Sequence, residues 1–224
     1  MGTSQLDPQW IVKNNGAEIH QTLNIDPGIA VGDTLFGGVD YKGTYYVAQN
    51  FDDDFIGFIF SLQNNRRFYV VMWKGGDQEY WLHTPFTAVG NAGIQLKLVN
   101  SKSGPGEMLR NSLWHNDNIT DEVTLLWRDE TNYSWDKETS YRWSLIHRPS
   151  IGVIRFKIHQ GIDLITDSGN VYDSTLKGGR LGVFCFSQEL ITWSKLIYRC
   201  NEKVPQEVYD DLPDLLKAQV EIDD

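Results

Sequence analysis

The stretch that decides the fold is NFDDDFIGFIFSLQNNRRFYVVMWK, residues 50–74. It holds two apolar runs rich in β-branched and aromatic residues, 55–60 and 68–73, on either side of the polar residues 63–65. Such runs favour strands, and Gln-Asn-Asn between them is typical of a turn. The stretch therefore predicts an antiparallel hairpin of two largely buried strands.

Three adjacent aspartates, Asp52, Asp53 and Asp54, precede the first run. Because successive side chains on a strand point to opposite faces, Asp52 and Asp54 would share one side and Asp53 would face the other. All three could meet one ion only if the chain bends there. Two interpretations stay open at this point: a cation site at a sheet edge, or a solvated strand end.

The composition restricts the class of protein. The 224 residues, 41% of them hydrophobic and 12% aromatic, suffice for one large all-β domain with a substantial core. No apolar run approaches 18 residues, so we expect no membrane insertion. A formal charge of −10 disfavours nucleic acid and heparin-like polyanions over most of the surface, and it favours hard cations and basic partners.

Short strand-like segments recur along the chain, whereas helical periodicity is scarce, which predicts a single-domain all-β sandwich. The main expected strands are 10–12, 18–23, 43–47, 79–83, 94–99, 123–127, 141–147, 151–159, 181–186 and 190–198. A short helix is expected over 107–113. We expect residues 1–6 to be linker or expression-derived residues, 7–204 to form the sandwich, and 205–224 to form a polar tail with a short helix around 214–220.

Enzyme signatures are missing from the sequence. No two acids alternate on one expected strand as a glycosidase pair would, and the G-x-S-x-G, H-E-x-x-H and phosphate-loop motifs do not occur. The five histidines are scattered singly. Trp73, Trp81, Trp143 and Trp193 lie in strand patterns, which favours core packing over a sugar-stacking platform. We therefore predict a protein that is not an enzyme.

Calcium is the ligand that the acidic residues suit best, because this hard ion takes six to eight oxygen ligands. The candidate metal ligands are Asp26, Asp40, Asp52, Asp53 and Asp54, all placed at expected strand ends. Carboxylates gathered at one edge repel each other without a cation. Replacing Asp52 or Asp54 by alanine is therefore expected to remove most of the stability gained from calcium, and to leave the melting midpoint of the calcium-free protein unchanged or slightly raised.

Two further features concern covalent chemistry. If 181–186 and 190–198 form a hairpin, Cys185 lies opposite Trp193, and Cys200 is too far along to bridge to it. We expect no bond between these two thiols. Asn118 and Asn132 begin N-x-S/T acceptor sequons in polar surroundings, so each is a candidate glycosylation site on an exposed loop.

A series of motifs in order along the chain carries a resemblance to a known family: DPQW (7–10), NIDPGIAVG (24–32), VDYKGT (39–44), DDDFIGF (52–58), RFYVVMWK (67–74), SGPGE (103–107), LRNSLWH (109–115) and GGRLGVFCFSQE (178–189). On these motifs the sequence resembles the C-terminal lectin-like domain of the thrombospondins, above all the pentameric subgroup that includes cartilage oligomeric matrix protein. The resemblance implies a concanavalin-like jelly-roll sandwich, calcium binding, secretion into the extracellular matrix, and contacts with matrix proteins such as collagen and with cell-surface receptors such as integrins or integrin-associated protein. It also implies that Cys200 pairs with a cysteine outside this chain.

One family motif has two possible roles. Arg67, Phe68, Tyr69, Val70, Val71 and Met72 match a peptide proposed in the family to bind integrin-associated protein. Their alternation is also a strand-core pattern, which favours burial. The EGF-like modules, calcium-wire repeats and coiled coil of the family do not occur in this chain, so oligomers are expected only through segments outside it. The competing function is a carbohydrate-binding lectin or, more remotely, a glycosidase on the same sandwich.

Overall fold

The hairpin of residues 50–74 lies at the centre of a six-stranded antiparallel sheet in the computed structural model, which describes residues 8–48 and 52–223. Strand β5 (Phe55–Asn64) pairs with β6 (Arg67–Lys74), with Ile59 opposite Val70. The predicted hairpin is therefore confirmed. The sheet order is β10 (Val123–Arg128), β9 (Gly93–Asn100), β6, β5, β15 (Arg180–Phe186) and β3 (Gly28–Val31).

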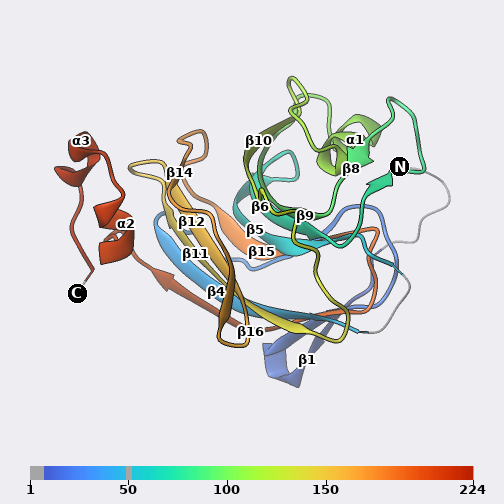
Figure 1. Ribbon diagram of the computed structural model, residues 1–224, viewed down its shortest axis with the longest axis horizontal. Helices are drawn as coiled ribbons and strands as arrows, with labels where there is room; N and C mark the ends of the chain where they lie inside the picture. Colours follow the sequence, from blue (N-terminus) through green and yellow to red (C-terminus); the bar gives the residue numbers. More distant parts are fainter. Residues whose placement is uncertain (1–7, 49–51, 224) are drawn as a thin grey trace.

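A second, eight-stranded antiparallel sheet lies against the first (Figure 1). Its order is β1 (Trp10–Lys13), β2 (Glu18–Gln21), β16 (Ile191–Cys200), β4 (Val39–Val47), β11 (Ser140–Arg148), β12 (Val153–Gln160) and β13 (Asp163–Asp167), with β14 (Val171–Tyr172) also paired to β12. The short strands β7 (Gln78–Glu79) and β8 (Val89–Gly90) form a separate pair, and a 3₁₀ turn, Asn14–Gly16, joins β1 to β2. The two layers confirm the predicted all-β sandwich.

Aromatic side chains fill the space between the sheets. Trp143 of β11 stacks on Phe58 of β5 with ring centroids 4.0 Å apart. Trp193 of β16 crosses the interface, and its Nε1 donates a hydrogen bond to the carbonyl oxygen of Gly57 at 3.0 Å. These rings bury large apolar areas, and the Trp193 hydrogen bond adds a polar link, so they hold the two sheets together.

The outer face of the six-stranded sheet is buried as well. Helix α1 (Glu107–Trp114) packs over it with Leu109, Leu113 and Trp114 in a second apolar cluster. This cover explains why β5 and β6 read as continuous apolar runs instead of alternating ones. The same cover buries the outward-facing side chains of β9: Lys97 is fully buried and donates hydrogen bonds to the carbonyl oxygens of Leu113 and His115.

The C-terminal segment packs on one end of the eight-stranded sheet. It holds two short helices, α2 (Gln206–Asp210) and α3 (Asp214–Lys217), of which only the second lies in a predicted region. Val208 and Leu212 are buried against Val153 of β12. Together with Val204, these contacts join the segment to the sandwich.

Three sequence-based expectations need correction. Residues 80–83 are not a strand, and β3, β8, β13 and β14 lie where no strand was expected. The strands β15 and β16 are not a hairpin, because they belong to opposite sheets. Cys185 and Cys200 are nevertheless both free, the first buried in β15 and the second exposed at the end of β16. The expectation for residues 1–6 lies outside the described residues.

Candidate functional site

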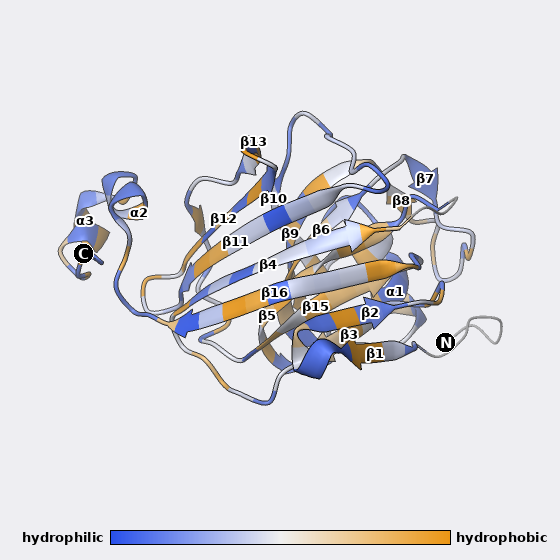
Figure 2. Cartoon of the chain, turned by 90° about the horizontal axis from the view of Figure 1, so that it is seen from below, coloured by the Kyte–Doolittle hydropathy of each residue, from blue (hydrophilic) through white to orange (hydrophobic). Residues whose placement is uncertain are grey.

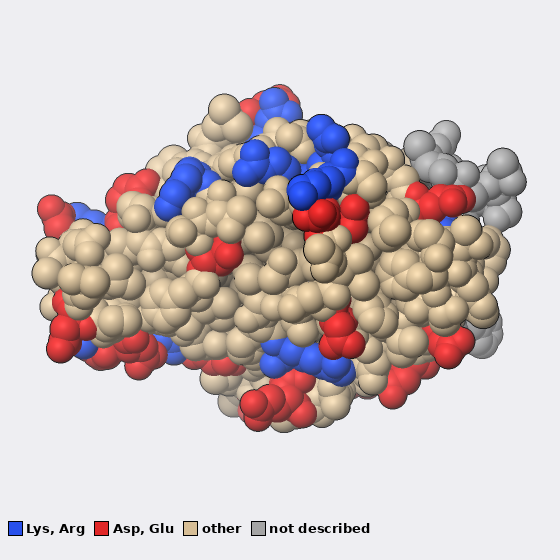
Figure 3. Space-filling view, turned by 90° about the horizontal axis from the view of Figure 1, so that it is seen from above, with Lys and Arg blue, Asp and Glu red and all other residues tan. Residues whose placement is uncertain are grey.

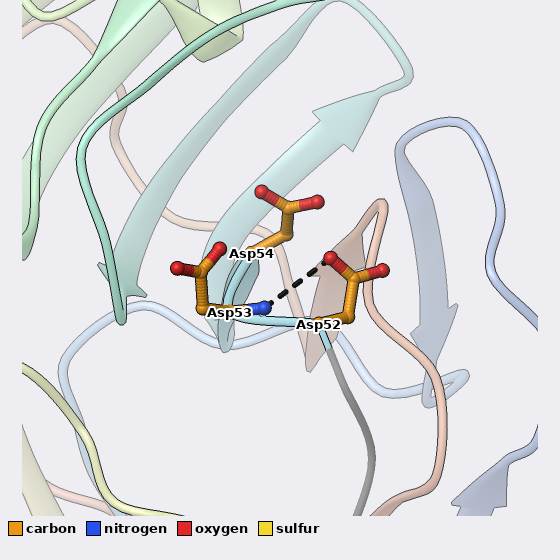
Figure 4. Close-up of side chains that lie close together, drawn as sticks. All are labelled: Asp52, Asp53 and Asp54. Atoms are coloured by element: carbon orange, nitrogen blue, oxygen red, sulfur yellow. Dashed lines mark hydrogen bonds between the residues drawn. The ribbon is translucent and has the colours of Figure 1, made fainter.

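The three adjacent aspartates lie in the bend that leads into β5 (Figure 4). Each of them can place a carboxylate oxygen within 4.8 Å of the other two. These residues precede the first residue of the strand, and the N–H of Asp53 donates to the carboxylate of Asp52 at 3.2 Å. The three carboxylates are therefore close enough to share one ion. We call Asp52, Asp53 and Asp54 the aspartate cluster.

Asp54 is the buried member of the cluster, and it is already paired. Its backbone N–H donates to the side-chain oxygen of Gln188 at 2.9 Å, and its carboxylate accepts a hydrogen bond from the ammonium of Lys74. Burial raises the pKa of Asp54 to about 7, although the attraction of the Lys74 charge acts in the opposite direction. Asp54 therefore belongs to an internal ion pair.

Lys74, the last residue of β6, is a functional residue that the sequence patterns did not single out. Its side chain is fully buried, with the ammonium 4.6 Å from the ring centroid of Trp114 and 3.7 Å from a carboxylate oxygen of Asp53. The strand register was the available signal, because a lysine directly after Trp73 must lie beside the start of β5, where the aspartates end. A protein cation thus already balances part of the cluster.

Asp26 lies at the same end of the sandwich. Its carboxylate accepts a hydrogen bond from the hydroxyl of Tyr80 at 3.2 Å, and the neighbouring Asn24 donates its amide to Asp52. The N–H of Ser187 donates to the carbonyl oxygen of Ile25 at 2.7 Å, which holds this turn beside the loop after β15. The structure therefore places Asp26 next to the aspartate cluster, without making it part of it.

Asp40 lies elsewhere and has other partners. It is on β4, at the outer surface of the eight-stranded sheet, where its carboxylate accepts hydrogen bonds from Arg148 at 2.7 Å and from Arg199 at 2.6 Å. Asn201 donates a further bond at 3.1 Å. Burial alone would raise the pKa of Asp40, but these hydrogen bonds outweigh it and lower the pKa. The structure does not bring Asp40 to the other candidate ligands.

The aspartate cluster fits a hard divalent cation by the chemistry of its donors. Asp52 and Asp53 remain accessible to solvent, and carboxylate oxygens are the groups that calcium prefers. Asp52 and Asp53 together carry two negative charges. The single positive charge nearby, on Lys74, is already paired with Asp54. Asp52 and Asp53, with a minor share from Asp54, are therefore the residues that would hold a calcium ion.

The receptor motif is buried. Phe68, Tyr69, Val70, Val71 and Met72 are at most 4% exposed, because β6 is flanked by β5 and β9 and covered on both faces. Only Arg67, at the start of the strand, is partly accessible. The folded domain cannot offer this segment to a receptor without opening the sheet, so we do not retain it as a binding site.

Two surface features have separate outcomes. Asn118 and Asn132 are both exposed, as a sugar acceptor must be, and glycosylation at either stays a prediction.

Trp81, which was expected in the core, is 50% exposed because residues 80–83 form a loop instead of a strand, whereas Trp73, Trp143 and Trp193 are buried as expected. Among the described residues, no helix has the length and apolar character needed to cross a membrane.

Similarity to solved structures is confined to the fold. The exoplasmic/lumenal domain of VIP36, in a form bound to Ca²⁺ and Man3GlcNAc, superposes with a TM-score of 0.55 at 10% identity, over 90% of this chain and 86% of that one. The carbohydrate-binding module CBM66 from Bacillus subtilis superposes with a TM-score of 0.52 at 9% identity, over 88% of this chain and 94% of that one. Both likenesses agree with the predicted lectin-like jelly roll.

Sequence relatives are much closer. The family described as "Thrombospondin C-terminal region" matches residues 5–202. Human Thrombospondin-3 is 55% identical over 98% of this chain and 23% of its own length, and bovine Thrombospondin-4 is 56% identical over 92% of this chain and 21% of its own length. The chain thus spans about a fifth of the length of these relatives. With the motifs, the sandwich and these matches agreeing over nearly its whole length, the chain belongs to the thrombospondin family and corresponds to its C-terminal region.

Proposed function

We propose that this chain is a non-enzymatic, calcium-binding adhesion module of a secreted extracellular matrix glycoprotein, which contacts matrix proteins and cell-surface receptors. The observation that carries the proposal is the match to the thrombospondin C-terminal region over residues 5–202. The bend that gathers Asp52, Asp53 and Asp54 supports the calcium part of it independently of the family.

In this proposal the calcium ion has a structural role. Asp52 and Asp53 would bind the ion from the bend before β5, and Asn24, which donates to Asp52, connects that bend to the turn containing Asp26. An ion bound to these carboxylates would reduce their mutual repulsion and fix the loops at this end of the sandwich. The fixed loops would then form a rigid surface for a protein partner.

Thermal unfolding with and without calcium tests this role. At a free calcium concentration ten times the dissociation constant, binding to the native state alone adds about 1.4 kcal/mol to the free energy of unfolding. We expect a melting midpoint a few degrees higher in calcium than in chelator, and no such shift with magnesium, which loses its water ligands reluctantly. Equal midpoints in calcium and chelator would refute a structural calcium site.

In this proposal the buried motif on β6 takes no part in the contacts with matrix proteins and receptors. Binding of collagen, integrins or integrin-associated protein would have to use exposed loops and the outer sheet face. Cell attachment can be compared between Arg67→Ala, which changes the one accessible residue of the motif, and exposed-loop variants such as Trp81→Ala. We expect cell attachment to this chain to survive Arg67→Ala. Loss of attachment through Arg67 alone would restore the motif as a candidate.

Carbohydrate binding is the second candidate function, and the exposure of Trp81 is the observation that favours it. A half-exposed indole on a loop can stack on the apolar face of a sugar ring. The two fold neighbours with sugar-related names add only the fold. A glycan array in calcium decides between the functions, because specific sugar binding that Trp81→Ala abolishes would favour the lectin over the adhesion module.

A further inference from the structure

The outer face of the eight-stranded sheet carries an unusual concentration of basic residues for a chain with a formal charge of −10. Strands β16, β4 and β11 lie side by side on this face (Figure 2). Between them is a basin of about 280 Å³, lined mainly by Lys42, Thr44, Arg142, Ser144, His159 and Lys195. No acidic residue lines it. We call this hollow the basic basin.

The strand register places these side chains next to each other. Lys42 of β4 is opposite Ser144 of β11, and Thr44 is opposite Arg142. Arg142 is in turn opposite His159 of β12. Directly opposed side chains on one sheet face lie about 5 Å apart at Cβ, so the three strands bring cations and hydroxyls to one spot. A bulge in β16, with Lys195 at a φ of 52°, adds a third cation from the other side.

The other cations of the same face are neutralised, whereas those of the basin are not. Four other basic side chains form salt bridges with acidic residues. Arg148 pairs with Asp40, Arg155 with Asp167 and Asp211, Lys157 with Asp167 and Glu207, and Arg199 with Asp40 and Asp223. Lys42, Arg142 and Lys195 form no salt bridge within the described residues. Three of the neutralising acids, Glu207, Asp211 and Asp223, come from the C-terminal segment, and none of them lines the basin.

Hydrogen-bond donors dominate the basin. Arg142 uses one of its five N–H groups on the carbonyl oxygen of Gly161 at 2.5 Å, and Lys42 and Lys195 donate no hydrogen bond to any described residue. The basin thus offers positive charge and many hydrogen-bond donors, and no carboxylate lines it. Such a site is complementary to an anion that accepts several hydrogen bonds.

We propose that the basic basin binds an oxyanion ester, a sulfate or phosphate group carried on a small polar ligand such as one sugar residue. Guanidinium and ammonium groups bind such oxyanions strongly, and Ser144 and Thr44 add hydroxyl donors beside them. The volume of about 280 Å³ exceeds that of a bare tetrahedral anion and leaves room for the group that carries it. This site is independent of calcium and of the adhesion function proposed above.

Calorimetric titration of the whole 224-residue chain tests the proposal. The probes are glucose 6-sulfate, glucose 6-phosphate and, as the neutral control, glucose. We expect saturable binding of at least one ester and no binding of glucose. A preference for one of the two esters identifies whether sulfate or phosphate is the natural group. Equal heats for all three sugars, or none for either ester, would overturn the proposal.

Two matched variants separate the basin from general charge attraction. The basin variant combines Lys42→Gln, Arg142→Gln and Lys195→Gln, and the control variant combines Lys13→Gln, Lys102→Gln and Lys203→Gln, which removes the same charge from exposed positions outside the basin. We expect the basin variant to bind the ester about tenfold or more weakly and the control to bind within about twofold of the parent. Equal weakening of both would show only non-specific attraction, which overturns the proposal. Unchanged melting midpoints confirm that both variants are folded.

Discussion

The aspartate cluster and the basic basin both concentrate like charges, but the fold treats them differently. At the cluster, Lys74 is fully buried and bonded to Asp54, so the protein supplies its own opposite charge. At the basin, Lys42, Arg142 and Lys195 face no acid. On the opposite side of the molecule, basic and acidic groups surround a large uncharged area (Figure 3). A compensated charge group contributes to stability, whereas an uncompensated group is available for a ligand from outside.

The largest expected effect comes from breaking the internal pair of the cluster. Asp54→Asn leaves the buried ammonium of Lys74 without its carboxylate, and removing one partner of a buried pair costs about 3–5 kcal/mol. This revises our expectation from sequence that the calcium-free protein would tolerate loss of Asp54. Urea unfolding in chelator measures the change, with Asp53→Asn, which is half-exposed, as the control. Equal losses for the two variants would contradict the separate role of Asp54.

The second effect concerns Asp40, a compensated acid two residues before Lys42 on β4. Asp40→Asn removes the carboxylate partner of the fully buried Arg148 guanidinium, so we expect a loss of about 3 kcal/mol at neutral pH. Because hydrogen bonds lower the pKa of Asp40 below 3.8 in the folded state, the unfolded chain binds more protons in acid. The stabilisation is therefore present above pH 3.8 and is lost as the pH falls through the folded pKa.

Unfolding of the parent and Asp40→Asn at several pH values checks the sign. The gap between the two proteins should be widest at neutral pH and should narrow below pH 3.8, because the parent then loses its charged carboxylate too. A gap that stays constant into acid would show that the pair with Arg148 contributes little.

The sequence predicted the fold better than the site. The hairpin of β5 and β6 could be read from its apolar runs, and the family motifs implied the jelly roll. What could not be read was which acids find a basic partner, because Lys74 and Arg148 reach Asp54 and Asp40 through strand register and sheet order. Local periodicity carries no information on contacts between residues far apart in the chain.

The same limit explains the missed strands and the missed basin. β3 and β14 are edge or two-residue strands whose sequence signal is weak, and β15 and β16 look like a hairpin because only three-dimensional packing sends them to opposite sheets. Lys42, Arg142 and Lys195 are each separated from the next by about 50 to 100 residues in the sequence, so their convergence appears only when β4, β11 and β16 are neighbours.

A smaller effect distinguishes the candidate calcium ligands. At calcium ten times above the dissociation constant the increment in the free energy of unfolding is about 1.4 kcal/mol, and Asp53→Asn should remove most of it. Asp40→Asn should keep it, because Asp40 is held by Arg148 and Arg199 away from the cluster. Melting with and without calcium gives both values. If Asp40→Asn also removed the increment, the sequence-based ligand set would be restored.

The smallest effect is expected at the basin, and its sign matters more than its size. The basin variant with Lys42→Gln, Arg142→Gln and Lys195→Gln removes three like charges from one exposed sheet face and breaks no salt bridge among the described residues. Because these charges repel each other, the free energy of unfolding should change by no more than about 0.5 kcal/mol, in the stabilising direction at low salt, and the gain should shrink as salt is added. Urea unfolding at low and high ionic strength measures both. A destabilisation of more than about 1 kcal/mol would mean that the basin cations stabilise the sheet. The basin would then resemble the aspartate cluster, whose charges are part of the fold.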